Sequence, residues 1–311
     1  MQPRKGAMRL GTRGSPLALA QARAVAALLA ERAGTQVEIV TIRTSGDRDA
    51  HASLAATGDV GFFTKEIEES LLRGAIDLAV HSMKDLPTTM PGGLAIGAVP
   101  LREKPFDVLV TRDGASLAAL PAGARVATSS PRRRAQLLAA RRDLAIVEIR
   151  GNVETRLGRL DAGACDAIVL AQAGLARLGL LSRTAVPLST DDFVPAPGQG
   201  AIAVQIREVD AATRRAVAAI DDADAHAATD AERAFLAALG GGCRVPIGAM
   251  CRRQNAAISL IGWISDPDGA TILRGQLDGD AARPQDLGRA LASQLLDQGA
   301  AQLLANAQKE N

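Results

Sequence analysis

The sequence predicts an α/β protein with two related α/β domains around a cleft and a smaller C-terminal α+β domain with an antiparallel sheet. Three observations favour this fold class. Apolar strand-like runs alternate with helix-like runs over the first two thirds of the 311 residues, a pattern typical of largely parallel sheets covered by helices. Several of these elements occur twice in the same order. From about residue 222 the alternation gives way to one helix, three strands and a final helix.

The first two helix starts share one design. In AMRLGTRGSPLALAQ a short apolar strand and a Gly-rich turn lead to Ser15, a natural N-cap, and to Pro16 at the first helical position. This helix ends near Gly34. The stretch ARVATSSPRRRAQLL repeats the plan with Ser130 and Pro131. The two turns therefore predict two equivalent strand-to-helix units.

A second pair of stretches supports a duplication. KEIEESLLRGAIDLAVHS and VETRLGRLDAGACDAIVLAQ each contain a helix, a Gly-Ala pair, one variable residue, an aspartate and an apolar strand. The matching positions are Gly74, Ala75, Asp77 and Val80 in the first stretch and Gly163, Ala164, Asp166 and Val169 in the second. We infer two related domains built from βαβ units.

The domain boundaries are predicted from Pro- and Gly-rich stretches. The segment 98–107 contains Pro100 and Pro105 and separates the two α/β domains. DDFVPAPGQGAIAVQIR ends in an apolar strand that returns the chain to the first domain. Because the chain passes twice between the two α/β domains, we expect a hinge there and a cleft between the domains. The expected domains are residues 1–100 with about 200–220, residues 105–195, and residues 222–311.

The C-terminal domain is expected to start with a helix. TDAERAFLAALGGG carries a capping box, Thr229 with Glu232, and its helix ends in glycines. RVPIGAMCR, AAISLIGWIS and ATILRGQL predict three strands, and a final helix is expected from about Pro284 to Ala307. Cys243 then lies in the loop between the first helix and the first strand.

Composition limits the location and the kind of site. MQPRKGAMRL has no apolar core of signal-peptide length, and no apolar run reaches the roughly 18 residues that span a bilayer. We therefore expect a cytoplasmic protein with no membrane partner. In a reducing cytosol, three cysteines without close paired spacing and three dispersed histidines predict neither a disulfide nor a metal site.

The basic residues indicate an anionic ligand. Only five of the 36 basic residues are lysine, and guanidinium groups bind carboxylates or phosphates through two N–H groups, although a coding bias would give the same count. Arg13 precedes the first cap, and Arg132 and Arg133 lie in the first turn of the second helix. Cations oppose the helix dipole there, whereas anions bind at helix N-termini. We infer that an anion lies between these arginines and each helix.

Nucleic acid is a poor candidate for this anion. The net charge is +2, and the chain contains five Phe, one Trp and no Tyr. Nucleic-acid binding needs a basic surface and, for single strands, aromatic side chains on which bases stack. A small polycarboxylate or phosphate fits the composition better.

Polar residues end the apolar strand in AVHSMKDLP, at the edge where open α/β sheets bind ligands. Asp85 offers a carboxylate that accepts N–H groups or handles protons, and Lys84 offers an ammonium that binds a carboxylate. A salt-bridged turn would explain this pair equally well. His81 is expected to pack or cap locally rather than to catalyse.

Cys243 differs from the other two cysteines, which lie in or beside apolar strands and are expected to be buried. Three glycines precede Cys243 and Arg244 follows it, so the thiol has little cover and its thiolate form is favoured. A hydrolase that uses Cys243 with His81 stays open, although no protease or nucleophile-elbow motif supports it.

Eight motifs occur in the order found in one family. They are GTRGSPLALAQ, FFTKEIEESLL, DLAVHSMKDLP, TSSPRRRAQL, RGNVETRL, DAIVLAQAGLARLGL, PAPGQGAIAVQ and GGGCRVPIGA. From about Arg9 to the C-terminal helix, the sequence resembles the porphobilinogen deaminases, also called hydroxymethylbilane synthases. The resemblance implies three domains, the first two similar to periplasmic binding proteins, in a monomeric transferase of haem biosynthesis.

The resemblance also implies the chemistry. Four porphobilinogen molecules are added head to tail, each losing ammonia, to a dipyrromethane cofactor that a thioether bond attaches to Cys243. Water then releases hydroxymethylbilane, which passes to uroporphyrinogen-III synthase. The implied catalytic residues are Asp85 and Lys84. The implied binding residues are Arg13, Ser15, Ser82, Thr128, Ser130, Arg132, Arg133, Arg150, Arg156, Arg177 and Gln199.

One segment departs from the family pattern. The loop before FTKEIE commonly contains lysines in a Gly-Gly-Lys-Gly arrangement, whereas residues 56–61 here include Asp59 and Val60. Lysine contacts from this loop therefore cannot be carried over. A function of another class stays open beside the enzyme, namely a non-catalytic two-domain binding protein for a small polycarboxylate or other anion, with an unmodified Cys243.

Overall fold

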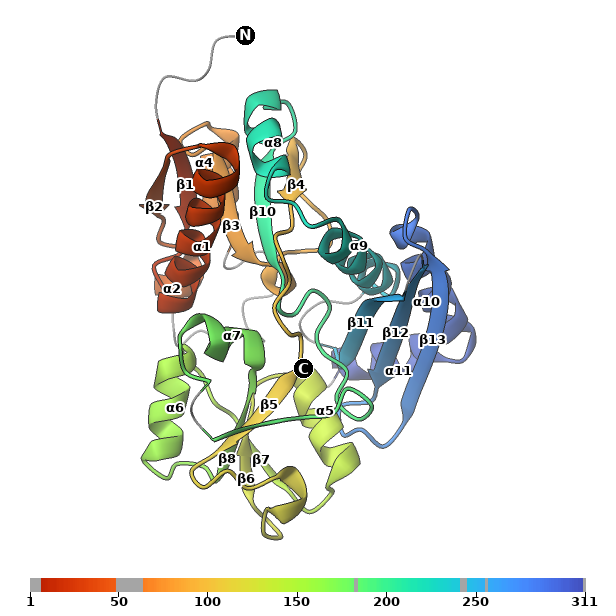
Figure 1. The fold of residues 1–311 in the computed structure, drawn as a ribbon. Coiled ribbons are helices and arrows are strands. Elements are labelled where there is room, and N and C mark those ends of the chain that lie inside the picture. The colour runs from red at the N-terminus through yellow and green to blue at the C-terminus, as the bar shows by residue number, and fades with distance from the viewer. Residues whose placement is uncertain (1–6, 49–63, 182–183, 241–244, 255–256, 310–311) are drawn as a thin grey trace. The chain divides into compact units, whose positions relative to one another are not determined.

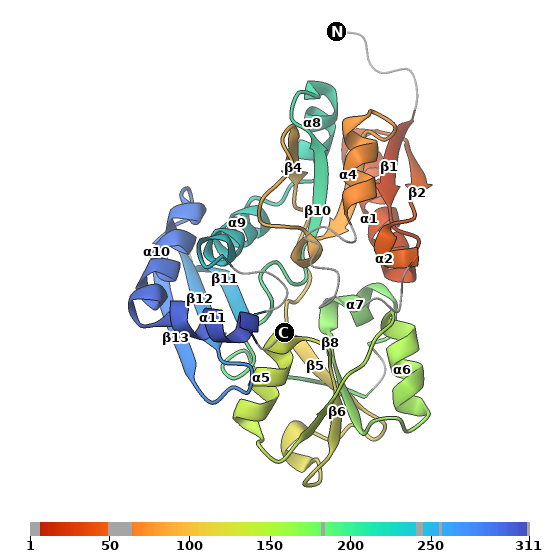
Figure 2. The same cartoon turned by 180° about the vertical axis from the view of Figure 1, so that it is seen from behind.

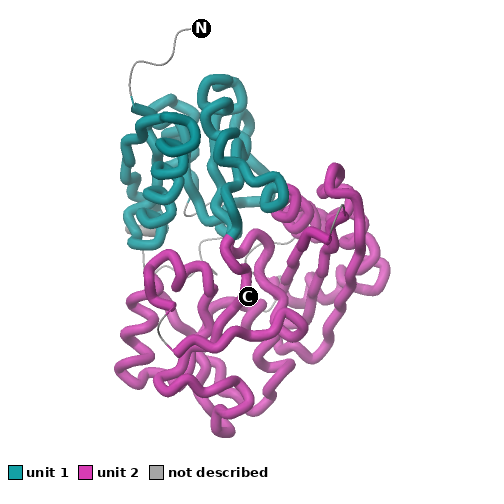
Figure 3. The backbone as a smooth tube through the Cα atoms, viewed as in Figure 1, with its two compact units in different colours: residues 1–102, 201–226 teal, residues 103–200, 227–311 magenta. Residues whose placement is uncertain are grey.

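The computed structural model describes residues 7–48, 64–181, 184–240, 245–254 and 257–309. The chain divides into two compact units (Figure 3). Unit 1 comprises residues 1–102 and 201–226, and unit 2 comprises residues 103–200 and 227–311. Among the described residues, no helix has the length and apolar character needed to cross a bilayer.

Unit 1 contains a five-stranded sheet with the order β2-β1-β3-β10-β4 (Figure 1). Its strands are β1 (Met8–Thr12), β2 (Val37–Thr41), β3 (Leu78–Ser82), β4 (Leu94–Ala98) and β10 (Ile202–Arg207). β10 runs antiparallel to both of its neighbours, β3 and β4. The predicted return of the chain into the first sheet is therefore confirmed.

Helices cover both faces of this first sheet. Unit 1 contains the helices α1 (Pro16–Ala33), α2 (Ser45–Arg48), α4 (Lys65–Leu72) and α8 (Ala211–Ala218), and a 3-10 turn η1 (Met83–Asp85) after β3. Successive strand residues point to opposite faces. Leu78 accordingly packs in a core with Val25 of α1, and Ala79 packs in another with Ile67 of α4. α1 and α8 lie on one face and α4 on the other (Figures 1 and 2).

Unit 2 contains a second five-stranded sheet, with the order β7-β6-β8-β5-β9. Its strands are β5 (Asp107–Thr111), β6 (Arg125–Ala127), β7 (Ala145–Val147), β8 (Ala167–Ala171) and β9 (Ala185–Pro187). The associated helices are α5 (Pro131–Ala140), α6 (Val153–Asp161), α7 (Gln172–Arg177) and the 3-10 turn η2 (Leu117–Ala119). β5 is antiparallel to both neighbours and occupies the place that β10 has in the first sheet, so the two sheets share one topology, as the duplication predicts.

The remaining part of unit 2 is an antiparallel sheet with the order β11-β12-β13. Its strands are β11 (Ile247–Gln254), β12 (Ala257–Ser265) and β13 (Ile272–Asp280), and its helices are α10 (Pro284–Asp297), α11 (Ala300–Lys309) and, from residue 227 on, α9 (Ala223–Ala238). Phe235 of α9 and Leu291 of α10 share one buried core with Leu260 of β12. The predicted fold class, two α/β sheets followed by a small antiparallel α+β part, is confirmed.

Two local predictions are wrong. The capping box at Thr229 and Glu232 does not form, because α9 starts at Ala223 and both residues lie buried inside it. The N-terminal cap is instead Asp222, whose carboxylate accepts from the Ala225 N–H at 2.8 Å. The expected single C-terminal helix is two helices, because Gly299 has φ 101° and interrupts it. The exact three-domain boundaries stay a prediction.

Candidate functional site

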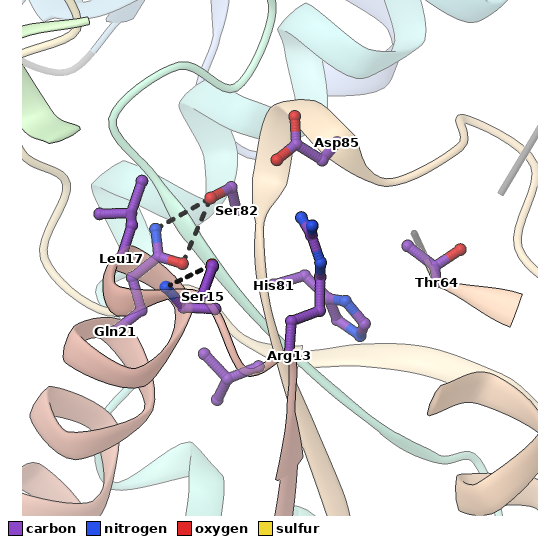
Figure 4. A pocket seen from close by; sticks show the side chains of 10 residues that line it. Arg13, Ser15, Leu17, Gln21, Thr64, His81, Ser82 and Asp85 are labelled. Carbon is purple, nitrogen blue, oxygen red and sulfur yellow. Dashed lines mark hydrogen bonds between the residues drawn. The ribbon is translucent and has the colours of Figure 1, made fainter. Parts of the chain in front are cut away.

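The first helix start places polar side chains around a pocket in unit 1. Ser15 is the N-cap of α1, and its hydroxyl accepts from the Ala18 N–H at 3.3 Å. The pocket has a volume of about 60 Å³. Its lining residues are Arg13, Ser15, Leu17, Ala18, Gln21, Thr64, Val80, His81, Ser82 and Asp85. Figure 4 shows the Arg13 side chain extending toward Asp85.

Four of the predicted site residues thus come together in this pocket: Arg13, Ser15, Ser82 and Asp85. Asp85 lies in the 3-10 turn η1 that directly follows β3, and its side chain is exposed. Lys84 belongs to the same turn and is partly exposed, but it is not among the lining residues. The pocket therefore combines a carboxylate at its exposed end with a guanidinium.

Gln21 is a pocket residue that the sequence interpretation missed. Its side-chain amide donates to the Ser82 hydroxyl at 2.9 Å, and that hydroxyl lies 3.2 Å from the Gln21 carbonyl oxygen, which can accept in return. Gln21 is buried on the same face of α1 as Ala22, Val25 and Leu29. A polar residue on an otherwise apolar helix face was the available signal, because buried amides require polar partners.

His81 lies behind the pocket in a chain of buried polar groups. Its Nε2 is 3.1 Å from the Gln205 side-chain oxygen, and the Gln205 amide donates to Glu68 at 2.9 Å. Thr64 donates to the other Glu68 oxygen at 3.3 Å. Burial lowers the pKa of His81 to about 4, opposed by the Gln205 hydrogen bond and assisted by the charge of Arg13. The imidazole is therefore neutral at pH 7, and the expectation that His81 packs inside its unit is confirmed by its burial.

The second helix start lines a larger pocket within unit 2. Ser130 is the N-cap of α5, with its hydroxyl 3.5 Å from the Arg133 N–H, and the Thr128 hydroxyl accepts from the Ser130 N–H at 3.2 Å. The pocket has a volume of about 440 Å³. Its lining residues are Thr128, Ser129, Ser130, Pro131, Arg134, Ile146, Glu148, Pro246, Pro267 and Asp268.

Arg132 and Arg133 point away from solvent and bind Asp107. Arg132 donates to one Asp107 oxygen at 2.7 Å, and Arg133 donates to the other at 2.7 and 3.1 Å. Further N–H groups of the two arginines donate to the backbone carbonyls of Val194 and Val169. All three side chains are buried, with exposed fractions of 8% or less.

Asp107 is the common acceptor of this cluster and was missed from the sequence. The Gln199 amide also donates to it, at 2.9 Å, and to the Pro105 carbonyl at 2.6 Å. Burial would raise the pKa of Asp107, but the charges and hydrogen bonds of the two arginines outweigh burial and lower it. The sequence signal for Asp107 was its position at the start of the apolar run DVLVT. A carboxylate in a buried strand is rarely without a cationic partner.

The other three predicted arginines lie apart from the lining of both pockets. Arg150 forms an ion pair with Glu148 at 2.5 Å. Arg156 donates to the Gly151 carbonyl at 2.8 Å, and Arg177 donates to the Gly200 carbonyl at 2.6 Å. All three are partly exposed. Cys243 and the loop 56–61 lie outside the described residues.

Two family models match the chain. Residues 8–215 match the model described as "Porphobilinogen deaminase, dipyromethane cofactor binding domain". Residues 227–297 match the model described as "Porphobilinogen deaminase, C-terminal domain". Together these matches extend over both described units, and the second begins where α9 enters unit 2.

Curated relatives match along almost the whole chain. The porphobilinogen deaminase of Desulforudis audaxviator is 50% identical over 95% of this chain and 96% of its own length. That of Rubrobacter xylanophilus is 50% identical over 96% and 97%, and that of Syntrophobacter fumaroxidans is 47% identical over 96% of each. The similarity to solved structures is much weaker: a putative methionine-binding lipoprotein of Bacillus subtilis is 14% identical with a TM-score of 0.42, over 70% of this chain and 90% of that one. On the evidence of the models and of these full-length relatives, the chain belongs to the porphobilinogen deaminase family.

Proposed function

We propose that the protein is a hydroxymethylbilane synthase, a transferase that joins four porphobilinogen molecules head to tail and releases ammonia at each addition. The observation that carries this proposal is the full-length family match together with the pocket that pairs Asp85 with Arg13. Porphobilinogen is a pyrrole with an aminomethyl group, an acetate and a propionate. It therefore needs both an acceptor for its N–H groups and cations for its carboxylates.

Asp85 is the proposed catalytic carboxylate. Loss of ammonia leaves an electron-poor carbon beside the pyrrole ring, and a nearby carboxylate stabilises the developing positive charge, accepts ring N–H groups and assists proton transfer. The position of Asp85 in the exposed turn after β3 makes it accessible to a ligand in the pocket. Lys84, in the same turn, is proposed to bind a substrate carboxylate.

A dipyrromethane cofactor, attached through a thioether to Cys243, is proposed as the primer. It would supply the pyrrole α-carbon to which the first substrate is joined. Thr128, Ser130 and Arg134 line the second pocket near the N-terminus of α5 and would bind its carboxylates, whereas Glu148 and Asp268 of the same lining would repel them. The cysteine lies outside the described residues, so attachment rests on the sequence motif.

The remaining proposed binding residues differ in how their side chains are used. Arg13, Arg150, Arg156 and Arg177 are partly exposed, and we assign them to carboxylates of the growing chain. Arg132, Arg133 and Gln199 donate to Asp107, so a ligand carboxylate would have to compete with that residue. Arg132 keeps one buried Nε–H that has no partner among the described residues.

Intact mass spectrometry tests the proposal. The enzyme is expected to carry an adduct of two linked pyrroles on Cys243, and Cys243→Ser is expected to lose it. An unmodified protein that also fails to assemble the adduct from porphobilinogen would favour the alternative, a non-catalytic two-domain anion-binding protein. That alternative predicts reversible ligand binding and no ammonia release.

Asp85→Asn separates catalysis from folding. We expect the variant to keep the thermal unfolding midpoint of the wild type, because Asp85 is exposed, and to lose nearly all turnover. Full activity would reject the proposed role of this carboxylate. We further propose a cytosolic monomer that passes hydroxymethylbilane to uroporphyrinogen-III synthase, and size-exclusion chromatography with light scattering tests the monomer.

A further inference from the structure

The polar chain behind the first pocket fixes the tautomer of His81. Glu68 accepts two hydrogen bonds, from Gln205 Nε2 at 2.9 Å on one oxygen and from the Thr64 hydroxyl at 3.3 Å on the other, and the nitrogen of a side-chain amide can only donate. The amide of Gln205 therefore points its NH₂ group to Glu68 and its oxygen to His81. Because that oxygen can only accept, His81 carries its proton on Nε2, 3.1 Å away.

The same arrangement leaves the second ring nitrogen of His81, Nδ1, as an acceptor. Nδ1 forms no hydrogen bond with any described residue, whereas the imidazole itself lines the pocket with Arg13 and Asp85. Figure 4 shows the ring beside the Arg13 side chain. Burial keeps this ring uncharged at pH 7, since the pKa of His81 is lowered to about 4. A neutral acceptor and a cation thus lie next to each other in one pocket.

We propose that His81 binds the substrate as a neutral acceptor, with its Nδ1 taking a hydrogen bond from an N–H group of porphobilinogen, while Glu68 and Gln205 position the ring. This inference rests on the proposed function. A lone pair attracts N–H groups and repels carboxylate oxygens, whereas the Arg13 guanidinium has the opposite preference. Together the two side chains distinguish the nitrogen-bearing end of the substrate from its carboxylates. The donor is either the ring N–H or the ammonium of the aminomethyl group.

The tautomer can be measured without any enzyme activity. In ¹⁵N NMR of the labelled wild type, Nδ1 of His81 is expected to show the shift of an unprotonated nitrogen and Nε2 that of a protonated one. In Glu68→Gln an amide replaces the carboxylate and can donate as well as accept, so Gln205 is free to rotate and the two tautomers are expected to mix. Glu69→Gln, the same change at an exposed position of α4, should leave the spectrum unchanged. A wild-type ring protonated at Nδ1 would overturn the proposal.

Two substitutions at His81 test substrate binding. The side-chain amide of His81→Asn places an acceptor near the Nδ1 position, whereas His81→Gln reaches toward Gln205 and leaves that position empty. We expect His81→Gln to lower kcat/KM by about tenfold, the loss expected for one hydrogen bond, and His81→Asn to recover part of it. If both His81 variants fold poorly, the near-isosteric Glu68→Gln replaces them. We expect it to lower kcat/KM by less than His81→Gln does. Unchanged kcat/KM in all folded variants would overturn the proposal.

A porphobilinogen analogue with a methyl in place of the aminomethyl group identifies the donor. If the ring N–H binds Nδ1, His81→Gln weakens inhibition by the analogue about tenfold, as it weakens kcat/KM for the substrate. If the ammonium binds, inhibition by the analogue stays the same while kcat/KM for the substrate falls. Either result supports an N–H donor, and no change for either molecule contradicts it. A wild type that neither binds nor turns over porphobilinogen would instead refute the proposed function, and the NMR result would stand independently.

Discussion

The two helix starts share a sequence design but use their arginines differently. At the start of α1, Arg13 precedes the Ser15 cap and lines a pocket. At the start of α5, Arg132 and Arg133 follow the Ser130 cap and are buried against Asp107. The equivalents of these two arginines in α1 are Leu17 and Ala18, which line the first pocket.

This difference shows that an arginine at a helix N-terminus is not by itself an anion site. A negative group near such an arginine offsets its repulsion from the helix dipole, and that group can belong to the protein. In unit 2 the protein supplies it, because Asp107 at the start of β5 accepts from both guanidinium groups. In unit 1 the guanidinium of Arg13 instead faces a pocket. Four predictions test how far this contrast extends.

The largest effect is expected from Asp107→Ala. Removing the carboxylate leaves two arginines buried without a counter-charge, which typically costs about 3 to 5 kcal/mol in the free energy of unfolding. Urea denaturation measures this loss. Asp268→Ala removes an exposed ion pair of similar length, 2.8 Å to Arg134, and should cost at most about 1 kcal/mol. Equal losses in the two variants would show that burial of the cluster does not matter.

A second effect concerns pH. The pKa of His81 is 6.5 in an unfolded chain and about 4 in the folded one, so the unfolded state binds more protons between these values. Stability is full above pH 6.5 and falls as pH drops to 4, by about 3 kcal/mol for this group. Urea unfolding across this range should therefore give a steeper loss for the wild type than for His81→Gln, which removes the imidazole but keeps Glu68, Arg13 and Asp85. Parallel curves would mean that His81 titrates normally.

The two serine caps should contribute alike. Ser15→Ala and Ser130→Ala each remove one side-chain acceptor from a helix N-terminus, 3.3 Å and 3.5 Å from its N–H group. Each substitution is expected to lower the free energy of unfolding by about 1 kcal/mol. Thermal or urea unfolding of both variants measures the difference. If only one substitution lowers the free energy of unfolding, the two caps differ in their contribution to stability despite their shared sequence design.

The smallest effect on stability is expected from Arg13→Ala. Arg13 is partly exposed, so its removal should change the free energy of unfolding by less than about 1 kcal/mol, whereas porphobilinogen incorporation should fall at least about tenfold through the lost charged contact. Denaturation and steady-state kinetics on the same sample separate the two quantities. Strong destabilisation with unchanged kinetics would show that Arg13, like Arg133, stabilises the fold and does not bind the substrate.

Local patterns were enough to predict most of the fold. The Ser-Pro caps, the repeated Gly-Ala-x-Asp stretch and the change of pattern near residue 222 lead to two sheets of equal topology and a small antiparallel sheet. Errors arose where one local signal competed with the continuation of a helix. Thr229 has the spacing of a capping box, yet α9 continues through it, and Gly299 breaks the last helix in a stretch that otherwise has helical periodicity.

The sequence by itself determined the polar strand end at Asp85 and the membership of the chain in its family, because these depend on residue types and on short motifs. It also predicted an anionic ligand, which stays a prediction. Only the tertiary structure decided which arginine faces a pocket and which is neutralised by Asp107, and that Gln205 and Glu68 fix the ring of His81. The partners in each case lie tens of residues or more apart in the chain. Their contact depends on how β3, β5 and β10 are ordered in the two sheets, and no local pattern encodes that order.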